Sequence, residues 1–333
     1  MNRKEIYEES GYINEAGIIE GDPAPFIFQI GGRGIGKTYG TLKHLIKRKE
    51  CFLYLRRTQA EIDTVITPEN SPFSQFIEST IKPAGKNIKN IYNKEGELIA
   101  QAAALSTFSN IRGVNFDHIR YIVFDEFIPE KTARPIKNEY EAFLNLYETI
   151  NRNRELIGES AVKAIMLANA NNLVTPLFWG LGLTGKLEEM IRKGKDYYKD
   201  EARGISVYFF RGSEISDKKR NTALYKLTEG SNFSEMSINN VFDYYDGDIR
   251  SLNLNNFKPF IRIGDLIIFY NKGEKQLYVR IGKSGTPKYE YEDTEEGHKL
   301  ARANHPYMGI SYLRGWVIFE NVTAREYFRL IFC

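Results

Sequence analysis

Short apolar runs alternate with amphipathic segments along the first half of the chain. Residues 25–30 and 51–55 each have the pattern of a buried strand, and between them Leu42, Leu45 and Ile46 recur at helical spacing while basic residues face out. A strand, helix, strand succession of this length favours a parallel sheet with right-handed crossovers. The pattern therefore predicts an α/β fold whose ligand lies at the carboxyl ends of the strands.

A glycine-rich loop follows the first predicted strand. Glycines let successive backbone N–H groups approach a polyphosphate closely, the Lys37 ammonium suits the β- and γ-phosphates, and the Thr38 hydroxyl suits Mg²⁺. Because a strand precedes the loop and an amphipathic helix follows it, we expect a nucleotide site with ATP and Mg²⁺ as ligands. The loop matches the phosphate-binding pattern G-x-x-x-x-G-K-[ST] with Gly31, Gly32, Arg33, Gly34, Ile35, Gly36, Lys37 and Thr38.

A second apolar run, residues 121–124, ends in the two carboxylates Asp125 and Glu126. This is the Walker B pattern, in which Asp125 is expected to hold Mg²⁺ and Glu126 to act as general base on the attacking water. A glutamate beside the aspartate is typical of ATPases, whereas kinases and GTPases position the nucleophile with other groups. ATP hydrolysis is the predicted chemistry.

Polar residues at the ends of other predicted elements are further candidates. Asn169 ends the apolar run 162–168 and is expected to hydrogen-bond the γ-phosphate or the lytic water, with an ordinary turn asparagine as the alternative. Arg56 and Arg57 end the strand 51–55, and one of them is expected to serve the nucleotide site; a surface pair is the alternative.

Arginines beyond the core strands could act on a neighbouring molecule. Arg152 and Arg154 follow a predicted helix that ends near Ile150, where they suit either an arginine finger reaching into a neighbouring subunit or a basic cap of the helix. Arg112 lies in the loop 106–113 and is a candidate for contacting DNA or a neighbouring subunit.

Composition sets limits on the class of protein. The chain has 333 residues, 42% of them hydrophobic, which suffices for two domains with separate cores. With a net charge of only +3, the protein as a whole does not have the basic surface expected of a general nucleic-acid binder. No apolar window approaches a membrane span, and the two cysteines, Cys51 and Cys333, cannot form a disulfide framework, so a reducing cytosol is expected.

The pattern of elements predicts three parts: a P-loop ATPase domain over residues 1–202, a helical linker over 203–240, and a smaller α+β domain over 241–333. Within the first part, residues 1–24 are polar and turn-rich, which predicts a lid or an arm laid over the domain, with no chemistry indicated for it. In the last part, residues 261–270 predict a strand that a turn returns to 276–281. Three antiparallel strands followed by helices are compatible with an RNase H-like fold.

With these motifs together, the chain resembles the phage DNA-packaging ATPases of the phi-29 type, which are allied to the FtsK/HerA translocases. The resemblance covers the ATPase domain and the linker better than the C-terminal domain. It rests on residues 31–38, 54–57, 122–128, 151–155, 167–170 and 230–237.

The resemblance implies a homo-oligomeric ring, a pentamer, that moves double-stranded DNA into a viral procapsid. The ring would dock through packaging RNA on the portal, in the host cell cytoplasm. It would make Arg152 the finger that acts in trans, Arg56 the partner that holds Glu126 between hydrolysis cycles, and Arg112 a basic residue acting across the subunit interface.

Two other functions stay open at this stage. A large terminase would share the ATPase plan and add a metal-dependent nuclease, which needs clustered carboxylates; Asp265 lies in a suitable predicted strand, but convincing partners are missing. We therefore expect a nuclease-like domain without nuclease chemistry that grips RNA, portal or DNA. A scaffold switched by bound nucleotide is the third possibility, against which Glu126 argues.

Overall fold

The computed structural model describes residues 6–111, 114–129, 136–169, 173, 175–211, 215, 218, 221–227, 248–274, 276–282 and 285–333. The chain forms two compact units, Met1–Asp243 and Tyr244–Cys333, each with its own sheet and its own hydrophobic core. None of the helices in the described ranges has the length and apolarity needed to cross a membrane.

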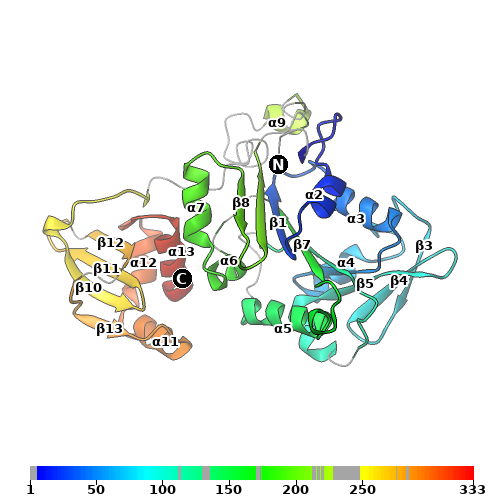
Figure 1. Ribbon diagram of the computed structural model, residues 1–333. Helices are drawn as coiled ribbons and strands as arrows, with labels where there is room; N and C mark the ends of the chain where they lie inside the picture. The colour runs from blue at the N-terminus through cyan, green and yellow to red at the C-terminus, as the bar shows by residue number, and fades with distance from the viewer. Residues whose placement is uncertain are drawn as a thin grey trace. The chain divides into compact units, whose positions relative to one another are not determined.

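A nine-stranded sheet forms the centre of the N-terminal unit, in the order β3-β4-β5-β2-β6-β7-β1-β9-β8 (Figure 1). The six strands from β5 to β9 pair in parallel, and antiparallel strands close both edges, so the predicted α/β fold with a mainly parallel sheet is confirmed. The strands are β1 (Phe26–Gly31), β2 (Phe52–Arg56), β3 (Ser79–Pro83), β4 (Ile88–Asn93), β5 (Leu98–Ala104), β6 (Tyr121–Asp125), β7 (Lys163–Asn169), β8 (Tyr197–Asp200) and β9 (Ile205–Phe210).

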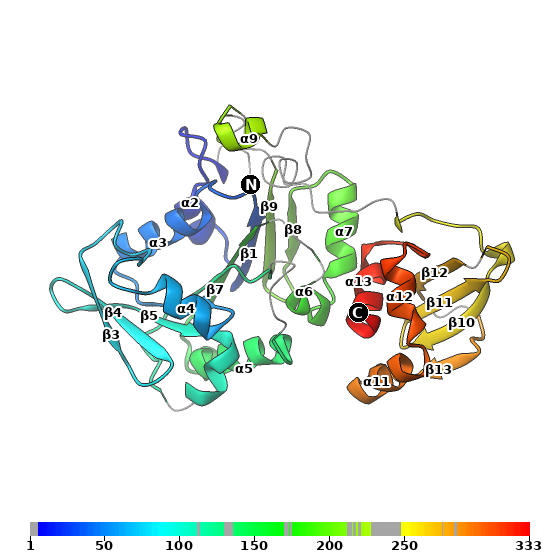
Figure 2. The same cartoon turned by 180° about the vertical axis from the view of Figure 1, so that it is seen from behind.

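Helices cover both faces of this sheet, which is why its central strands are apolar without alternation. Figure 2 shows helices packed beside the sheet. On one face Leu42 and Ile62 join the strand side chains in a core cluster, and on the other the Phe124 and Phe143 rings stack 6.0 Å apart. The helices are α2 (Glu15–Gly21), α3 (Lys37–Lys47), α4 (Gln59–Val65), α5 (Glu139–Asn151), α6 (Pro176–Gly180), α7 (Thr184–Arg192) and α9 (Ala223–Leu227), with 3-10 turns at Leu105–Ile111 and Glu155–Ile157.

Strand order brings the candidate motifs to one edge of the sheet. Strand β7 lies between β6 and β1, and the register pairs Gly31 with Asn169 and Asp125 with Leu167. The carboxyl ends of the P-loop strand, the Walker B strand and the Asn169 strand are therefore neighbours. This is the edge at which parallel sheets bind their ligands.

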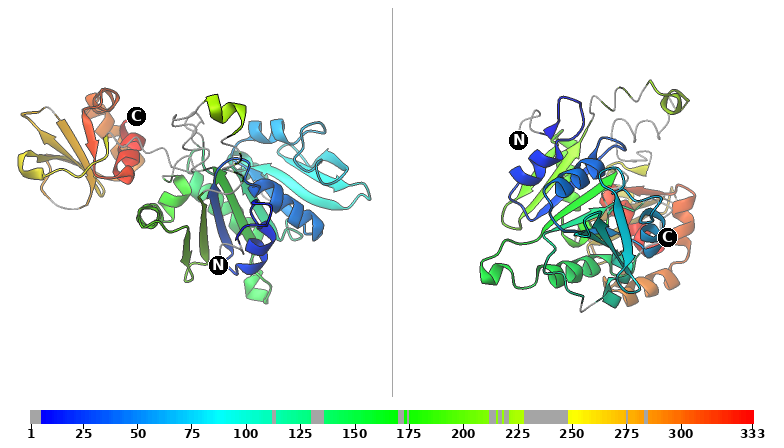
Figure 3. Two further views of the ribbon diagram at one scale, coloured as in Figure 1. Left: turned by 90° about the horizontal axis from the view of Figure 1, so that it is seen from above. Right: turned by 90° about the vertical axis from the view of Figure 1, so that its right-hand side faces the viewer.

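Two features of the N-terminal unit differ from the sequence-based expectation. Strand β9 begins at Ile205 and pairs with β1, so the sheet continues past residue 202, where we placed the end of the ATPase domain. The antiparallel hairpin of β4 and β5 continues into a third strand, β3, which the apolar pattern does not predict; Figure 3 shows the cyan hairpin at one edge of the sheet. No residue of β3 is buried, so its sequence has no apolar alternation to reveal a strand.

The C-terminal unit has a five-stranded sheet in the order β13-β10-β11-β12-β14. Three helices cover one face through a core cluster that includes Met308 and Phe328, and the segment 252–257 contributes to the cluster on the other face. The elements are β10 (Lys258–Ile263), β11 (Leu266–Asn271), β12 (Gln276–Ile281), β13 (Tyr289–Tyr291), α11 (Glu295–Asn304), α12 (Tyr307–Leu313), β14 (Val317–Phe319) and α13 (Val322–Phe332), preceded by a 3-10 turn at Leu254–Asn256.

The run 261–270, which the apolar pattern predicts as one strand, is two strands joined by a tight turn. Gly264 has a φ of 55° and Asp265 follows it in the turn, after which β11 returns antiparallel to β10. Two turn residues do not interrupt the apolar pattern on either side, so the sequence hides the break. Asp265 is consequently an exposed turn residue and does not lie within a strand.

Candidate nucleotide site

The glycine-rich loop joins the end of β1 to the start of α3. Gly34 and Gly36 have φ angles of 67° and 102°, a region that side chains with a Cβ rarely adopt. The buried Lys37 folds its ammonium over the loop, where Nζ donates hydrogen bonds to the carbonyl oxygens of Gly31 at 2.9 Å and Gly32 at 2.7 Å. Loop amides and the N-terminus of α3 thus form a cradle suited to an anion.

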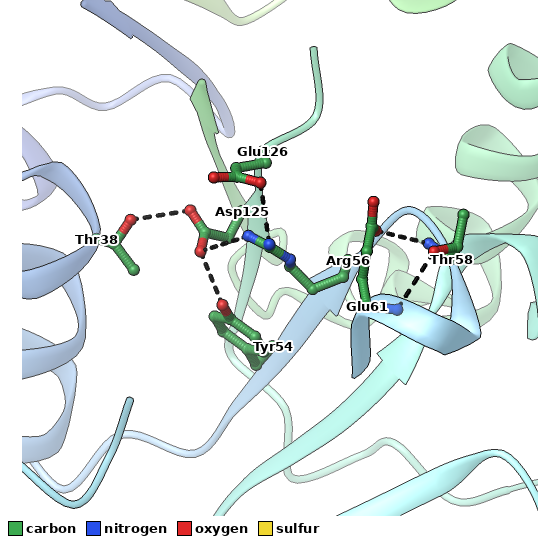
Figure 4. A network of polar contacts seen from close by, with 7 residues as sticks. All are labelled: Thr38, Tyr54, Arg56, Thr58, Glu61, Asp125 and Glu126. Atoms are coloured by element: carbon green, nitrogen blue, oxygen red, sulfur yellow. Dashed lines mark hydrogen bonds and ion pairs between the residues drawn. The ribbon is translucent and has the colours of Figure 1, made fainter. Parts of the chain in front are cut away.

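The two Walker B carboxylates share one arginine (Figure 4). Arg56 donates from Nη1 to Asp125 Oδ2 and from Nη2 to Glu126 Oε2, both at 3.0 Å. Asp125 also accepts from Thr38 Oγ1 at 2.9 Å and from the Tyr54 hydroxyl at 2.7 Å. Burial, with the nearby Asp125 carboxylate, raises the pKa of Tyr54 well above its ordinary value, so this hydroxyl stays protonated and donates.

Glu126 differs from its neighbour in exposure and in backbone conformation. The Asp125 side chain is 9% exposed, whereas that of Glu126 is 49% exposed. Glu126 has a φ of 57°, and the next residue resumes the sheet pattern by donating its backbone N–H to the carbonyl of Leu167. The left-handed turn at residue 126 therefore directs one carboxylate to the rim of the site while the other stays at its base.

A cavity of about 360 Å³ lies between the loop and the carboxylates. Asn169, at the end of β7, lines it together with residues of both motifs, so the structure brings most of the sequence-predicted site residues into one place. The lining residues are Arg33, Gly34, Gly36, Lys37, Thr38, Tyr39, Asp125, Glu126, Ala168 and Asn169.

The arginines after α5 do not line this cavity, and they differ from each other. Arg152 is 47% exposed at its side chain and pairs through Nη1 with Asp117 Oδ1 at 2.9 Å. Arg154 is buried, donates to the carbonyl of Asp117 at 2.8 Å, and has its pKa lowered by that burial. Arg152 is thus available to another molecule, while Arg154 fastens the chain before β6. Arg112 lies outside the described residues.

Sequence reasoning missed one contact and left one arginine unassigned. Tyr54 was not expected to contact Asp125, although residues two apart on a strand share a face and Tyr54 stands two before Arg56. Arg57 points to the opposite face, where Nε and Nη2 bind both carboxylate oxygens of Glu139 at 2.7 and 2.8 Å in a fully buried pair. The alternation of the strand was the signal that separates the two arginines.

Comparison with known proteins places the chain in a family. Residues 8–251 match the podovirus DNA encapsidation protein (Gp16) family. The chain is 32% identical over 220 residues to the DNA packaging protein of Bacillus phage B103, covering 65% of this chain and 63% of that protein. The DNA packaging protein of Bacillus phage phi29 is also 32% identical over 220 residues, covering 61% of its length. The chain thus aligns with less than two thirds of the length of these relatives.

The fold is also similar to that of a solved structure. A chain of the bacteriophage Phi-29 viral genome packaging motor assembly superposes with a TM-score of 0.65 at 24% identity, covering 96% of this chain and 99% of that one. The similarity therefore extends over both units of the fold. Since the family match spans the phosphate-binding loop and both Walker B carboxylates, the chain belongs to the podovirus DNA encapsidation protein (Gp16) family.

Proposed function

We propose that this protein is an ATP-hydrolysing motor that translocates double-stranded DNA into a viral procapsid. The observation that carries the proposal is the cavity in which Lys37, Thr38, Asp125, Glu126 and Asn169 meet, in a chain of the DNA encapsidation family. These are the groups that bind a triphosphate, hold its metal ion and activate water.

Each residue of the cavity then has a role. Lys37 binds the β- and γ-phosphates, and Glu126 acts as general base on the attacking water. Thr38 and Asp125 would hold Mg²⁺; their oxygens already lie 2.9 Å apart beside the phosphate cradle, which fits the ion's preference for oxygen ligands. Bound Mg²⁺ would neutralise charge that develops on the phosphates. Asn169 hydrogen-bonds the γ-phosphate or the water.

Arg56 restrains the site before hydrolysis. Its guanidinium holds Glu126 Oε2 at 3.0 Å, so this oxygen is directed at Arg56 and away from a water at the phosphate cradle. Glu126 has to leave Arg56 before it can polarise the nucleophile. We propose that this exchange separates a resting site from a hydrolysing one.

The proposed assembly is a homo-oligomeric ring, a pentamer, docked through packaging RNA on the portal of a procapsid in the host cell cytoplasm. Arg152 is its trans finger. The exposure of Arg152 and its absence from its own subunit's cavity support this role, whereas the burial of Arg154 fits a structural role. Arg112 remains a candidate for a contact with DNA or with the next subunit.

We propose that the chain divides into an ATPase domain that includes β9, a linker that follows it, and a C-terminal domain of RNase H-like type that grips RNA, portal or DNA without cutting it. Among the described residues, Asp248 of the C-terminal unit forms an ion pair with Arg325 at 3.3 Å, and Asp293 Oδ1 and His298 Nε2 share a hydrogen bond at 2.7 Å. A terminase that cuts DNA is the alternative, and it requires metal-dependent cleavage by this unit.

ATPase assays on the purified full chain, with and without double-stranded DNA and procapsids, test the proposed function. We expect hydrolysis that requires Lys37 and Glu126 and that rises when DNA and procapsids are both present. Hydrolysis that survives in Lys37→Ala would remove the assigned site. Binding of ATP without turnover under every condition would favour the nucleotide-switched scaffold.

A further inference from the structure

The N-terminal arm contacts the phosphate-binding loop from outside the cavity. The backbone N–H of Ile13 donates to the carbonyl of Ile35 at 3.1 Å, and the Tyr12 ring lies so near Gly36 that a Cβ there would come within 3.2 Å of it. The arm therefore touches the loop at two consecutive residues, Ile35 and Gly36. The loop has few side chains of its own, so its shape depends on such neighbours.

Glu15, the first residue of α2, lies between the two elements that flank the loop. It is 2% exposed, and its Oε2 accepts a hydrogen bond at 2.7 Å from Nε2 of Gln29, which is two residues before the loop on β1. On the other side it packs on Gly40 of α3, where a Cβ would lie 2.6 Å from the Glu15 Cγ. One side chain thus contacts the strand that enters the loop and the helix that leaves it.

The surroundings of Glu15 favour a neutral carboxyl. Burial raises its pKa to about 8, although the Gln29 hydrogen bond and the positive charge of Lys37 act in the opposite direction. The Thr41 hydroxyl also hydrogen-bonds the Glu15 carboxyl and acts to lower its pKa, so burial outweighs all three influences. Among the described residues, the buried Gln29 Oε1 has no donor, and a proton on Glu15 adds a donor beside it, which a carboxylate cannot do.

We propose that Glu15 is a positioning residue for the phosphate-binding loop, holding β1 and α3 together so that the loop keeps its anion-binding shape. The inference rests on the proposed nucleotide site. It gives the arm, for which the sequence suggested no chemistry, a part in ATP binding. Glu15 touches neither the cavity nor the substrate, and it acts through the loop.

The proposal has a definite sign in pH. Below about pH 8 the Glu15 carboxyl is neutral and holds β1 and α3 together. As pH rises through that value, a buried negative charge appears near Lys37, whose positive charge is the one that acts on Glu15 among the described residues. It attracts the ammonium that should bind phosphate and repels the polyphosphate itself. Nucleotide affinity should therefore be full near neutral pH and should fall at alkaline pH.

The test measures the Kd of a fluorescent ATP analogue with Mg²⁺, from about pH 7 to about pH 9, on the full chain. We expect wild-type affinity to fall about tenfold across this range, the scale of ~1.4 kcal/mol that one unit of coupled pKa represents. Glu15→Gln keeps the shape without the ionisation, so it should match wild type near pH 7 and stay level. Glu15→Ala should bind about tenfold more weakly at every pH.

Glu20→Gln is the matched control. Glu20 lies on the same helix and pairs with Arg48, the C-cap residue of α3, at 2.8 Å, but at the exposed surface. This variant should keep the wild-type pH profile. Circular dichroism at each pH establishes whether every variant is folded. If Glu15→Ala does not fold, the pH dependence of nucleotide affinity in Glu15→Gln tests the proposal by itself.

Three outcomes would overturn the proposal. One is a Glu15→Gln variant that loses affinity at alkaline pH as wild type does, and another is a folded Glu15→Ala that binds normally. The third is a Glu20→Gln variant that loses the pH dependence. Failure of the proposed function looks different, because wild type and Lys37→Ala would then bind nucleotide equally poorly at every pH. The proposed role of Glu15 would be lost together with the nucleotide site.

Discussion

In the N-terminal unit two carboxylates end a buried parallel strand and face a cavity, whereas carboxylates of the C-terminal unit lie in a hairpin turn or in ion pairs. Asp125 and Glu126 meet the phosphate loop because β6 and β1 run in the same direction, with one strand between them. Asp265 lies in the turn of an antiparallel hairpin, and Asp248 pairs with Arg325 of α13.

The difference shows that strand direction matters more to a site than the supply of acidic residues. Parallel strands bring several carboxyl ends to one edge, where side chains far apart in sequence converge. An antiparallel hairpin sends its ends to opposite edges. Within the described residues, no three His, Cys, Asp or Glu side chains are grouped to hold a metal. Four sets of substitutions test this contrast.

The largest effect is expected at the phosphate loop and its carboxylate. Lys37→Ala should abolish nucleotide binding or weaken it severely, because this ammonium already occupies the loop. Glu126→Gln should bind nucleotide and fail to hydrolyse it, since only the base is lost. Fluorescent nucleotide binding and phosphate release measure the two. Lys47→Ala, at the exposed end of α3, is the control; wild-type turnover by Glu126→Gln would remove the base from the scheme.

Arg152→Ala should leave nucleotide affinity nearly intact and reduce turnover about 10³-fold, the usual scale of an arginine finger. If the residue acts in trans, mixing this variant with Glu126→Gln subunits should restore some phosphate release, because some interfaces then hold an intact pair. Arg120→Ala is the matched control, since Arg120 is also 47% exposed in a surface ion pair. Mixtures that assemble and stay inactive would place Arg152 in cis.

Glu139→Ala should lower the free energy of unfolding by about 3–5 kcal/mol, because it leaves the buried Arg57 guanidinium without a counter-ion. Glu159→Ala removes a surface pair with Arg120 and should cost about 1 kcal/mol or less. Chemical denaturation followed by circular dichroism compares them. Equal losses would mean that burial does not distinguish the two pairs.

The smallest effect is expected in the C-terminal unit. The full chain with Mg²⁺ or Mn²⁺ should leave plasmid DNA intact, and Asp265→Ala should change nothing, since a two-metal nuclease needs a cluster of carboxylates and, among the described residues, Asp265 belongs to no group of three metal-ligating side chains. Agarose gels over time follow the plasmid. Cleavage that vanishes in Asp265→Ala would establish the terminase alternative.

Local signals explain what the sequence could predict. The phosphate loop and the Walker B strand can each be recognised from about eight consecutive residues. Their convergence follows from the parallel topology that the order of the elements implies. Pairings across the chain could not be read in this way: Arg57 and Glu139 are 82 residues apart. Glu15 was also out of reach, since a glutamate in a polar arm has the pattern of an exposed residue.

The left-handed backbone of Glu126 bears on how this protein can evolve. A non-glycine residue at a φ of 57° is held there at a cost of about 1 kcal/mol or more, which glycine would not incur. Selection for thermostability alone would favour Glu126→Gly, and that substitution removes the proposed base. At position 126, therefore, a substitution that raises thermal stability is expected to lower activity. A screen for stable variants should recover inactive proteins with substitutions at this position.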